Sequence, residues 1–476
     1  MSTIFDKNEK GKNKFRIHGF DYQGLDKIPD EYINDSLDLT DVNETEVVRH
    51  YTKLSTMNFG VDTGMYPLGS CTMKYNPKIN ERLSSLEGFT NHHPLLDEEL
   101  SQGSLEILYE LANCLTKITG FDRFSLAPAA GAHGELTAVM VMKKYFEDIN
   151  EDRKVIIIPD SAHGTNPASV AMCGFDVVTV ESDKEGNVDL EKLAEILDKN
   201  VAGMMLTSPN TLGLFDNNIL KISKMLHDNG SLFYADGANL NALMGIAKMK
   251  DMGFDMMHIN LHKTFSTPHG GGGPGSGPVG VVEKLAKYLP VPVVVKDGEK
   301  YKLDYNLPDS IGRVHSFYGN FLIAVRAYIY IRMLGAEGLK EVSETAVLNA
   351  NYLLSKLRNE FNLPIDRICM HEFVLNDEGF PNHITTNEIS KRILDYGFHA
   401  PTVYFPLNIH GAIMIEPTET ESKENLDKFI DAMVEIKKEA GEDPEMLKNA
   451  PHTTSVKKVD VVTAAKMPVL KWEKDN

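Results

Sequence analysis

The feature that most constrains the fold of this 476-residue chain is a series of short apolar runs that alternate with stretches of helical periodicity. Four runs are too short for helices and are rich in β-branched or other apolar residues, and a longer apolar segment follows them. The five segments are 155–158, 177–180, 204–207, 232–235 and 252–261. Helical spacing recurs between them, for example over 190–197 and 219–227. Near-continuous apolar strands that alternate with helices predict an α/β fold, with a mostly parallel sheet covered by helices on both faces.

The segments before this region predict an arm and the start of a large domain. Residues 1–60 are polar and acidic, and they are predicted to form an N-terminal arm with short helices, a kind of segment that often wraps a partner subunit. A large domain is predicted over 61–335. Within it, apolar residues at helical spacing predict a helix over 102–119, capped by Gly120. A second helix is expected from about Glu135 to Phe146.

A smaller C-terminal α+β domain with a polar tail is predicted over 336–476. It is expected to follow a helix over 317–334 and to begin with a long bridging helix over 341–362. The remaining elements of the prediction are strands at 370–375 and 413–415 and a helix at 426–440.

Charge and cysteine usage exclude several classes of function. With 49 basic and 68 acidic residues, the net charge of -19 argues against nucleic acid or an anionic membrane as the main partner. The four cysteines are scattered without a C-x-x-C pair, so neither a zinc knuckle nor a disulfide framework is indicated. The first residues lack the apolar region of a secretory signal, and no apolar run approaches the ~20 residues of a membrane span. We therefore expect a soluble cytoplasmic protein.

Lys263 lies where the last apolar segment ends, just before the glycine-rich run 269–278. A lysine between a buried strand and a loop that can approach a ligand closely suggests an amine held for covalent chemistry. The run also contains a G-x-G-x-x-G match at 275–280, but a dinucleotide site needs a strand running directly into its first glycine, so we interpret the match as accidental. No Gly-Lys-Ser/Thr follows, which excludes a P-loop. Taken alone, Lys263 would more often be a surface lysine.

Polar groups follow the successive predicted strands, and their order supports the chemical interpretation of Lys263. They lie at 160–167, 207–211 and 236–239, and Lys263 follows Asp236 by 27 positions. Ligands of such sheets bind at the carboxyl ends of the strands, so we expect these groups to lie close together. The small residues Ala130, Gly131 and Ala132 precede a predicted helix whose N-terminus could bind a phosphate.

Pyridoxal phosphate matches this set of groups. Its aldehyde would form a Schiff base with Lys263, and its ring nitrogen stays protonated beside a carboxylate such as Asp236. His163 and Ala238 could pack on the two faces of the ring, and the turn at 130–132 could hold the phosphate. Thr207 and His262 complete the predicted cofactor-binding set.

Taken singly, the same residues also have purely structural explanations. Asp236 alone is more often a helix N-cap, and His163 alone a buried core histidine. A histidine metal site is the main rival chemistry, since His258 and His262 are four apart and His92 and His93 are adjacent. No H-E-x-x-H motif is present, however, and the His-Gly-Glu at 133–135 lacks the P-C-x-x-C of a zinc deaminase. No metal is therefore expected.

Five stretches of the sequence, and together most of the chain, resemble a known family. The stretches are 66–77, 129–135, 160–167, 236–239 and 260–275. They are similar to the catalytic subunits of glycine dehydrogenase (decarboxylating), the P-protein of the glycine cleavage system. The resemblance implies a fold-type I pyridoxal-phosphate enzyme of glycine catabolism. Such an enzyme decarboxylates glycine, releases carbon dioxide and transfers the aminomethyl group to the lipoyl arm of the H-protein, with Lys263, His163 and Asp236 as the catalytic residues.

The same resemblance implies a partner. Many family members fuse two homologous halves, of which one keeps the lysine, whereas this chain has the length of one half and retains Lys263. It is therefore similar to the split type, which implies a companion subunit 1, with two copies of each subunit in a heterotetramer. His133 is a departure, because many relatives have glutamine there, and its role stays open.

The substrate channel is the least determined part of the prediction. Its candidate lining residues are Ser70, Cys71, His92, His93 and His315, with Arg313 as a candidate for binding the glycine carboxylate. Two other functions remain open from the residues alone. One is another fold-type I enzyme, such as an amino-acid decarboxylase or a cysteine desulfurase. The other is a non-catalytic scaffold subunit, although a scaffold has no need of the Lys263 amine.

Overall fold

The computed structural model describes residues 3–7, 29–32, 40, 42–93, 96–270 and 275–473. The chain divides into two compact units, Met1–Gly60 and Val61–Asn476. The described elements of the first unit are two short 3₁₀ helices, η1 (Phe5–Lys7) and η2 (Asp30–Tyr32), and helix α1 (Glu44–Ser55). Much of the predicted N-terminal arm lies outside the described residues, and so do residues 271–274 of the glycine-rich run.

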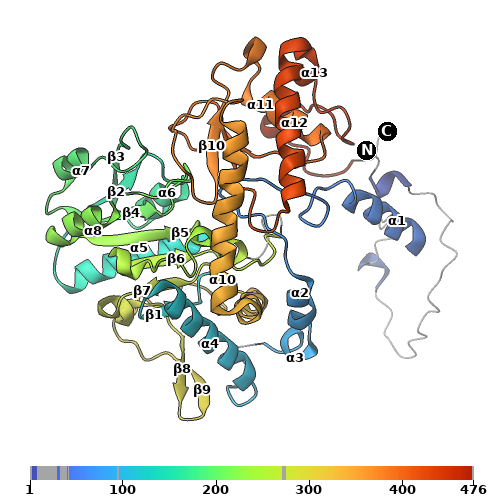
Figure 1. Ribbon diagram of the computed structural model, residues 1–476. Helices are drawn as coiled ribbons and strands as arrows, with labels where there is room; N and C mark the ends of the chain where they lie inside the picture. Colours follow the sequence, from blue (N-terminus) through green and yellow to red (C-terminus); the bar gives the residue numbers. More distant parts are fainter. Residues whose placement is uncertain are drawn as a thin grey trace. The chain divides into compact units, whose positions relative to one another are not determined.

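The second unit is built on a seven-stranded sheet with the order β1-β7-β6-β5-β4-β2-β3 (Figure 1). Its strands are β1 (Arg123–Ser125), β2 (Val155–Pro159), β3 (Asp176–Val180), β4 (Val201–Thr207), β5 (Leu232–Gly237), β6 (Met256–Ile259) and β7 (Val279–Val281). The pairs from β3 through β2, β4 and β5 to β6 are parallel, and only β7 pairs antiparallel, with β6 and β1. The predicted mostly parallel sheet is confirmed.

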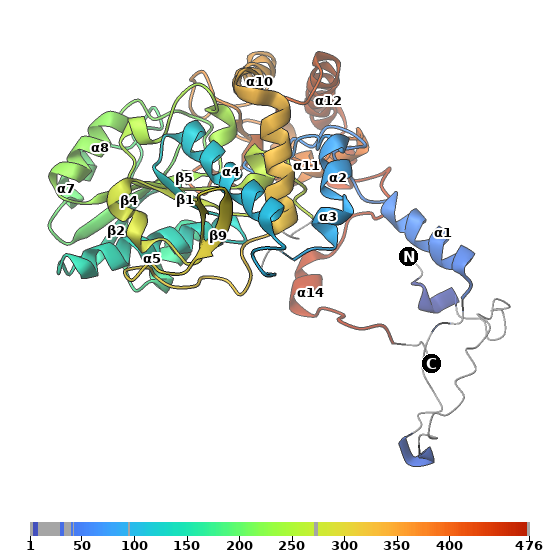
Figure 2. The same ribbon diagram turned by 90° about the horizontal axis from the view of Figure 1, so that it is seen from below.

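Helices cover both faces of this sheet, because each central strand is apolar on both sides. In β2, Ile157 packs into a core with residues of α4, α7, α8 and α10, whereas Ile156 and Ile158 pack on the opposite face with residues of α5 and α6. Figure 2 shows α5 on one side of the sheet and α4 and α10 on the other. The bounds are α4 (Gln102–Thr119), α5 (Gly131–Asp148), α6 (Thr165–Met172), α7 (Leu190–Ile196), α8 (Ile219–Asp228) and α10 (Phe321–Leu357).

Two helix predictions need correction at their ends. Helix α4 ends as predicted, with Gly120 in the left-handed conformation as its C-cap. Helix α5, however, begins at Gly131 and not near Glu135, so Gly131 and Ala132 form its first turn instead of a preceding loop. The two helices predicted over 317–334 and 341–362 are one long element, α10, interrupted at Gly335 by a non-helical backbone (φ 64°, ψ -171°). The first turn, Gly131 to Gly134, lacks the large apolar residues whose spacing marks a helix, which explains the late start predicted for α5.

A second, antiparallel sheet has the order β10-β12-β11 and packs with α11, α12 and the C-terminal part of α10. Its elements are β10 (Phe373–Asn376), β11 (Thr402–Val403), β12 (Ala412–Ile415), α11 (Thr386–Asp395) and α12 (Lys423–Glu442). Leu68, far earlier in the chain, forms an isolated bridge with Ile415. The segment around residue 70 is therefore joined to this second sheet.

The remaining described elements are short. They are α2 (Lys78–Ser84), α3 (Glu87–Thr90), α9 (Leu261–Thr264), the hairpin β8 (Val293–Asp297) and β9 (Lys300–Asp304), α13 (Pro444–Lys448), α14 (Val461–Lys466) and the 3₁₀ helices η3 (Leu240–Ala242), η4 (Lys250–Met252), η5 (Glu283–Tyr288) and η6 (Pro381–His383). The second glycine of the G-x-G-x-x-G match, Gly277, packs against Ala130, and its last, Gly280, lies within β7. The match therefore does not open a helix, as we interpreted from the sequence.

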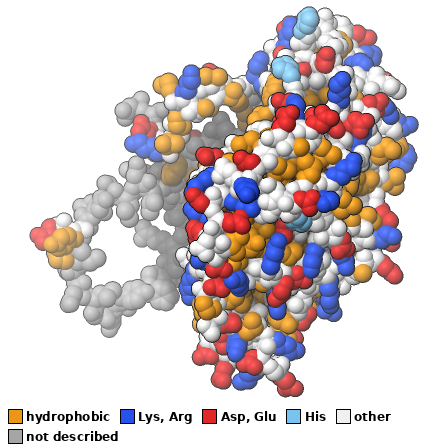
Figure 3. Space-filling model, turned by 90° about the vertical axis from the view of Figure 1, so that its left-hand side faces the viewer, with side chains coloured by type: hydrophobic (Ala, Val, Ile, Leu, Met, Phe, Trp, Pro, Cys, Tyr) orange, Lys and Arg blue, Asp and Glu red, His pale blue; other side chains and the backbone are white. Residues whose placement is uncertain are grey.

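The surface of the described residues carries mixed charge. On the face shown in Figure 3, acidic and basic side chains are interspersed, and hydrophobic side chains gather in patches between them.

None of the described helices is both long enough and apolar enough to cross a membrane.

Candidate functional site

A cavity of about 240 Å³ lies where β4, β5 and β6 end and where α5 begins. It collects residues that are far apart in the sequence but that follow successive parallel strands, as expected for this kind of sheet. Its lining residues are Ser70, Gly131, Ala132, Glu135, His163, Thr165, Thr207, Thr211, Asp236, Ala238, Asn239, His258, Asn260, His262 and Lys263.

Lys263 reaches this cavity from α9, a single helical turn that follows β6 directly. The sequence suggested a strand that gives way to a loop, so the lysine is held by a more regular element than expected. Its Nζ donates a hydrogen bond of 2.7 Å to the carbonyl oxygen of Ser70. The amine is therefore fixed on one side and faces the cavity that Asp236 also lines.

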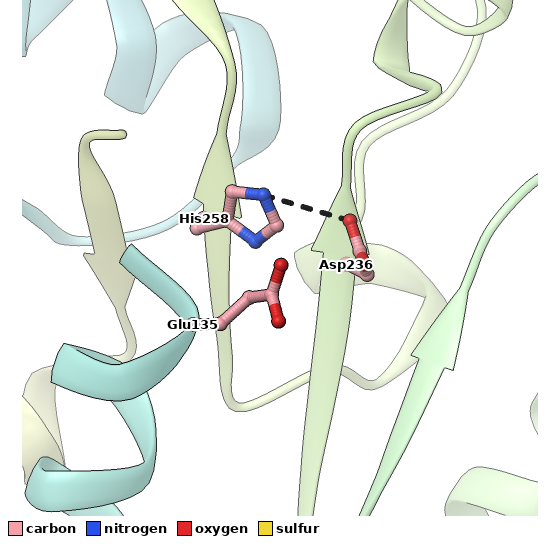
Figure 4. A group of neighbouring side chains, drawn as sticks. All are labelled: Glu135, Asp236 and His258. Atoms are coloured by element: carbon pink, nitrogen blue, oxygen red, sulfur yellow. Dashed lines mark ion pairs between the residues drawn. The ribbon is translucent and has the colours of Figure 1, made fainter. Parts of the chain in front are cut away.

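Asp236 is the next-to-last residue of β5, and it is only 2% exposed. Its carboxylate accepts hydrogen bonds from Asn166 Nδ2 (3.1 Å) and from the backbone N–H of Ala238 (3.0 Å). His258 Nε2 lies 3.5 Å from Asp236 Oδ1, as the dashed line in Figure 4 shows. Each of these three partners can donate a hydrogen bond to the Asp236 carboxylate.

His258 contacts Asp236 as a neutral ring. Burial lowers the pKa of His258 below its ordinary value, which outweighs the opposite effect of the Asp236 carboxylate. Its Nε2 also lies 2.7 Å from Asn260 Oδ1, and its Nδ1 lies 2.5 Å from the Tyr234 hydroxyl. Two acceptors at Nε2 imply that this nitrogen carries the proton. The contact with Asp236 is thus a polar contact of a neutral imidazole and not an ion pair.

Glu135 is a second buried carboxyl group in the same cluster (Figure 4). It lies in the first turns of α5 and accepts hydrogen bonds from Thr165 Oγ1 (2.9 Å) and Asn166 Nδ2 (3.3 Å). Burial, and then the nearby charge of Asp236, raise the pKa of Glu135 to about 8. At neutral pH, Glu135 is therefore mostly protonated, and the floor of the cavity carries one negative charge instead of two.

Replacing Glu135 by glutamine should change how stability depends on pH. Because the folded pKa of Glu135, about 8, lies above its ordinary 4.5, its contribution is fully present below pH 4.5 and is lost as pH rises toward 8. In urea unfolding of the chain without added cofactor, the free energy of unfolding of Glu135→Gln relative to the wild type should rise between pH 5 and pH 8.5. The rise should be on the order of 2 kcal/mol. Glu341→Gln, at an exposed position, is the control. A pH-independent difference would contradict the assignment.

The start of α5 can accept an anion. Its N-cap, Ala130, makes no side-chain capping bond, and Gly131 and Ala132 line the cavity, so first-turn N–H groups lie beside it. The site leaves no room for larger residues, since a Cβ on Gly131 would lie 2.5 Å from Asn260 Nδ2. Thr207 Oγ1 is buried and has no hydrogen-bond partner among the described residues. A bound phosphate group would satisfy both features.

His163 and His262 line the cavity as neutral rings. His163 Nδ1 lies 2.8 Å from Thr165 Oγ1, and burial lowers the pKa of His163. His262 Nδ1 accepts a hydrogen bond from the backbone N–H of Ser276 (3.2 Å), and burial, followed by the neighbouring His269, lowers the pKa of His262 to about 3. Uncharged rings suit contact with a flat heterocycle better than solvated cations do.

Several predicted channel residues lie elsewhere. His92, His93 and His315 line a separate cavity of about 380 Å³ with aromatic residues such as Phe317, beside the start of α10. Arg313 lies outside the Lys263 cavity, with its guanidinium 5.1 Å from the centre of the Tyr305 ring. Ser70 does line the Lys263 cavity, and the adjacent Cys71 is close enough for the Lys263 charge to act on its thiol, whose pKa burial raises.

The structure adds lining residues to which the sequence gave no individual role in cofactor binding. They are Glu135, Thr165, Thr211, Asn239, His258 and Asn260. All six lie within one to four residues of a predicted site residue, so closeness in sequence to those residues was a usable signal. Their side-chain direction was not, because it depends on how neighbouring strands pair.

The sequence matches two family models and is similar over its full length to named relatives. Residues 342–453 match a family model described as "Glycine dehydrogenase, C-terminal domain", and residues 132–272 match the "Aminotransferase class-V" model. Two relatives carry the name "Probable glycine dehydrogenase (decarboxylating) subunit 2". The one from Caldanaerobacter subterraneus subsp. tengcongensis is 56% identical, with 99% of each chain covered. The one from Staphylococcus epidermidis is 54% identical, with 99% of this chain and 95% of the relative covered.

Solved structures show the same fold at low sequence identity. A glycine decarboxylase (P-protein) of the glycine cleavage system, in inhibitor-bound form, has a TM-score of 0.71 at 19% identity and covers 86% of this chain and 93% of its own. A cysteine desulfurase from Thermococcus onnurineus has a TM-score of 0.62 at 16% identity and covers 79% and 95%. The fold is therefore that of fold-type I pyridoxal-phosphate enzymes, as predicted.

Proposed function

The chain belongs to the family of glycine dehydrogenase (decarboxylating) subunit 2, and from this membership we propose that it decarboxylates glycine with pyridoxal phosphate and transfers the aminomethyl group to the lipoyl arm of the H-protein. The observation that carries the proposal is one cavity lined by a lysine amine, a buried carboxylate and the N-terminus of a long helix. These are the groups that an aldehyde, a pyridine nitrogen and a phosphate require.

The residues of the cavity fit the cofactor. Lys263 would bind its aldehyde carbon, and Asp236 would face its ring nitrogen. His163 and Ala238 would contact the ring, and His262 would lie nearby. The first turn of α5, from Ala130 to Ala132, and the unpartnered hydroxyl of Thr207 would bind the phosphate. When bound, pyridoxal phosphate supplies an electron sink for the charge that remains when a bond at the glycine α-carbon breaks.

The protein's own residues set the charge around this sink. The N–H groups of Asn166 and Ala238 and the neutral His258 surround the Asp236 carboxylate. Protonated Glu135 adds no second negative charge, because burial raises its pKa. A single carboxylate in a buried setting acts strongly on a protonated ring nitrogen, since little water screens the interaction. Lys263, held by the Ser70 carbonyl, is placed to give or take a proton at its Nζ.

The proposal includes partners. The relatives' designation as subunit 2 implies a companion subunit, and we propose that two copies of each subunit form a heterotetramer in the cytoplasm. The lipoylated H-protein would deliver the acceptor arm. The domain division proposed from the sequence, with an arm over 1–60, a large domain over 61–335 and a small domain over 336–476, assigns the cofactor residues to the large domain.

Exchange of labelled bicarbonate into the carboxyl group of glycine tests the proposal. The chain, co-purified with its companion subunit and supplied with pyridoxal phosphate, should catalyse exchange, and lipoylated H-protein should strongly increase it. The chain alone and H-protein without its lipoyl group are the controls. Release of carbon dioxide from another amino acid, or of sulfur from cysteine, without glycine exchange would point to the alternative fold-type I activities.

A further inference from the structure

The loop that receives Lys263 has an unfavourable backbone. Ser70, whose carbonyl oxygen accepts the lysine Nζ, has a φ of 62°, and Thr72 has a φ of 48°. Residues with a Cβ avoid this left-handed region, and β-branched threonine avoids it most strongly. Two such residues within three positions persist only where the surroundings hold them.

Two buried glutamates beside the strands of the second sheet accept hydrogen bonds from this loop. Glu372 Oε2 accepts a hydrogen bond from the backbone N–H of Ser70 at 2.6 Å, and Glu416 Oε2 accepts one from the N–H of Thr72 at 2.8 Å. Both glutamates are fully buried. They flank the pair Phe373 and Ile415, which lie opposite each other in the register of β10 and β12. The antiparallel sheet thus directs two carboxyl groups to the two strained residues.

The far end of the loop is tied to the helix that carries the lysine. Lys74 Nζ donates to the carbonyl oxygen of Thr264, the residue after Lys263, at 2.9 Å. The same amine forms a buried salt bridge of 2.8 Å with Glu419. The loop is therefore fixed at both ends, with Glu372 and Glu416 at one end and Lys74 at the other. Two hydrogen bonds join the loop to the lysine helix: the Ser70 carbonyl accepts from Lys263 itself, and Lys74 donates to the Thr264 carbonyl.

The glutamate pair is costly to bury, which sets it apart from ordinary loop anchors. Burial, and then the charge of Glu416, raise the pKa of Glu372 well above its ordinary value, and burial raises the pKa of Glu416 to about 7. His371 lies 3.8 Å and 3.9 Å from their carboxyl oxygens, and neither of its ring nitrogens has a hydrogen-bond partner among the described residues. Buried polar groups that lower stability in this way are typical of functional sites.

Resting on the function proposed above, we propose that Glu372 and Glu416 are positioning residues for Lys263: by holding the N–H groups of Ser70 and Thr72, they keep the Ser70 carbonyl where it receives the lysine amine. The second sheet and its helices would then set the reactivity of a lysine that belongs to the first sheet. Neither glutamate lines the cavity, so neither is expected to touch glycine.

Variants that move or remove the acceptor test the inference. In Glu372→Ala and Glu416→Ala, the subunit complex should attach pyridoxal phosphate to Lys263 at least about tenfold more slowly, because small misplacements of reacting groups cost up to about 10²-fold in rate. The rate is followed by absorbance after cofactor is added to cofactor-free protein, and the lysine is identified by borohydride reduction and peptide mass spectrometry. The kcat for exchange should fall by a similar factor, with KM for glycine changed by less than about threefold.

Conservative variants separate positioning from folding. Glu372→Gln keeps a carbonyl oxygen at the same place and should attach cofactor within about threefold of the wild-type rate. Glu372→Asp keeps the carboxyl group but withdraws the acceptor oxygen, so it should resemble Glu372→Ala. If an alanine variant fails to fold, the attachment rates of Glu372→Gln and Glu372→Asp test the inference instead: the Gln variant should be fast and the Asp variant slow.

A matched control comes from another buried carboxylate. Asp216 is 4% exposed and accepts hydrogen bonds from the backbone N–H groups of Val188 (2.8 Å) and Asn218 (2.7 Å), but it does not line the cavity. Asp216→Ala should lower the Tm much as the glutamate variants do, while the attachment rate of the cofactor, measured well below the Tm, stays at the wild-type value.

Three outcomes would overturn the inference. The first is attachment at the wild-type rate in Glu372→Ala and Glu416→Ala. The second is a Gln variant as slow as the Ala variant, which would make charge and not the acceptor decisive. The third is a stoichiometric divalent metal in the purified wild type that is lost in these variants, which would make His371, Glu372 and Glu416 a metal site. If the wild type attaches cofactor but does not catalyse glycine–bicarbonate exchange, the proposed function is wrong. The attachment rates of the variants then still test the positioning role of Glu372 and Glu416.

Discussion

Lys263→Ala should lower glycine–bicarbonate exchange by about 10³-fold or more, the range expected when a group that acts both as a covalent attachment point and in proton transfer is lost. Alanine removes the amine that faces Asp236 across the cavity and leaves the Ser70 carbonyl without its donor. Initial rates at saturating glycine, together with the absorption spectrum of the added cofactor, measure the effect.

The fold should survive this change, because the Lys263 side chain donates one hydrogen bond, to Ser70, and lies in a single helical turn whose backbone bonds alanine keeps. The free energy of unfolding should change by about 1 kcal/mol. Lys221→Ala, at an exposed position on α8, controls for the loss of a lysine and should leave exchange unchanged. Retention of full exchange by the Lys263→Ala variant would refute the assignment of the site.

Asp236→Asn should lower kcat by roughly 10²- to 10³-fold while cofactor remains bound, a loss comparable to removing one preorganised electrostatic group from an active site. Asparagine has nearly the same shape and keeps an oxygen for the Ala238 N–H, but it lacks the charge that stabilises a protonated ring nitrogen. Steady-state exchange rates and equilibrium titration with pyridoxal phosphate separate turnover from binding.

Asp255 offers a matched control for this substitution. It is also a buried aspartate beside the same sheet, but its partners are Lys284 (2.7 Å) and His227 (2.9 Å), away from the cavity. Asp255→Asn should lower the free energy of unfolding but leave kcat near the wild-type value. Equal kcat in the wild type and in Asp236→Asn would remove the role assigned to the carboxylate.

The five parallel strands of the first sheet and the position of Lys263 could be predicted from local patterns, whereas the short strands β1 and β7 were not predicted. The strands β2, β4, β5 and β6 are short apolar runs with both faces buried, and such a run is a local property of the sequence. The edge strand β3 is mostly exposed, but its run of β-branched residues was also a local signal. Parallel strands bring their carboxyl ends to one edge, so Asp236, Thr207 and Lys263 were expected to meet, and they line one cavity.

Other parts of the site depended on packing that no local pattern encodes. His258 meets Asp236 because β5 and β6 pair in one register, and Glu135 faces both because α5 starts four residues earlier than its apolar pattern indicates. Conversely, Arg313 and the histidines at 92, 93 and 315 have suitable chemistry but lie in other cavities.

The amino-acid sequence by itself determined the α/β class, the strand-end positions of the lysine and the aspartate, and the family, because short-range periodicity and motif spacing are written along the chain. Only the tertiary structure decided what surrounds them. Glu372 and Glu416 lie 302 and 344 positions from the loop residues that they hold, and their contact exists only because an antiparallel sheet closes on a distant segment. Such meetings follow from strand register and burial, which are properties of the folded chain as a whole.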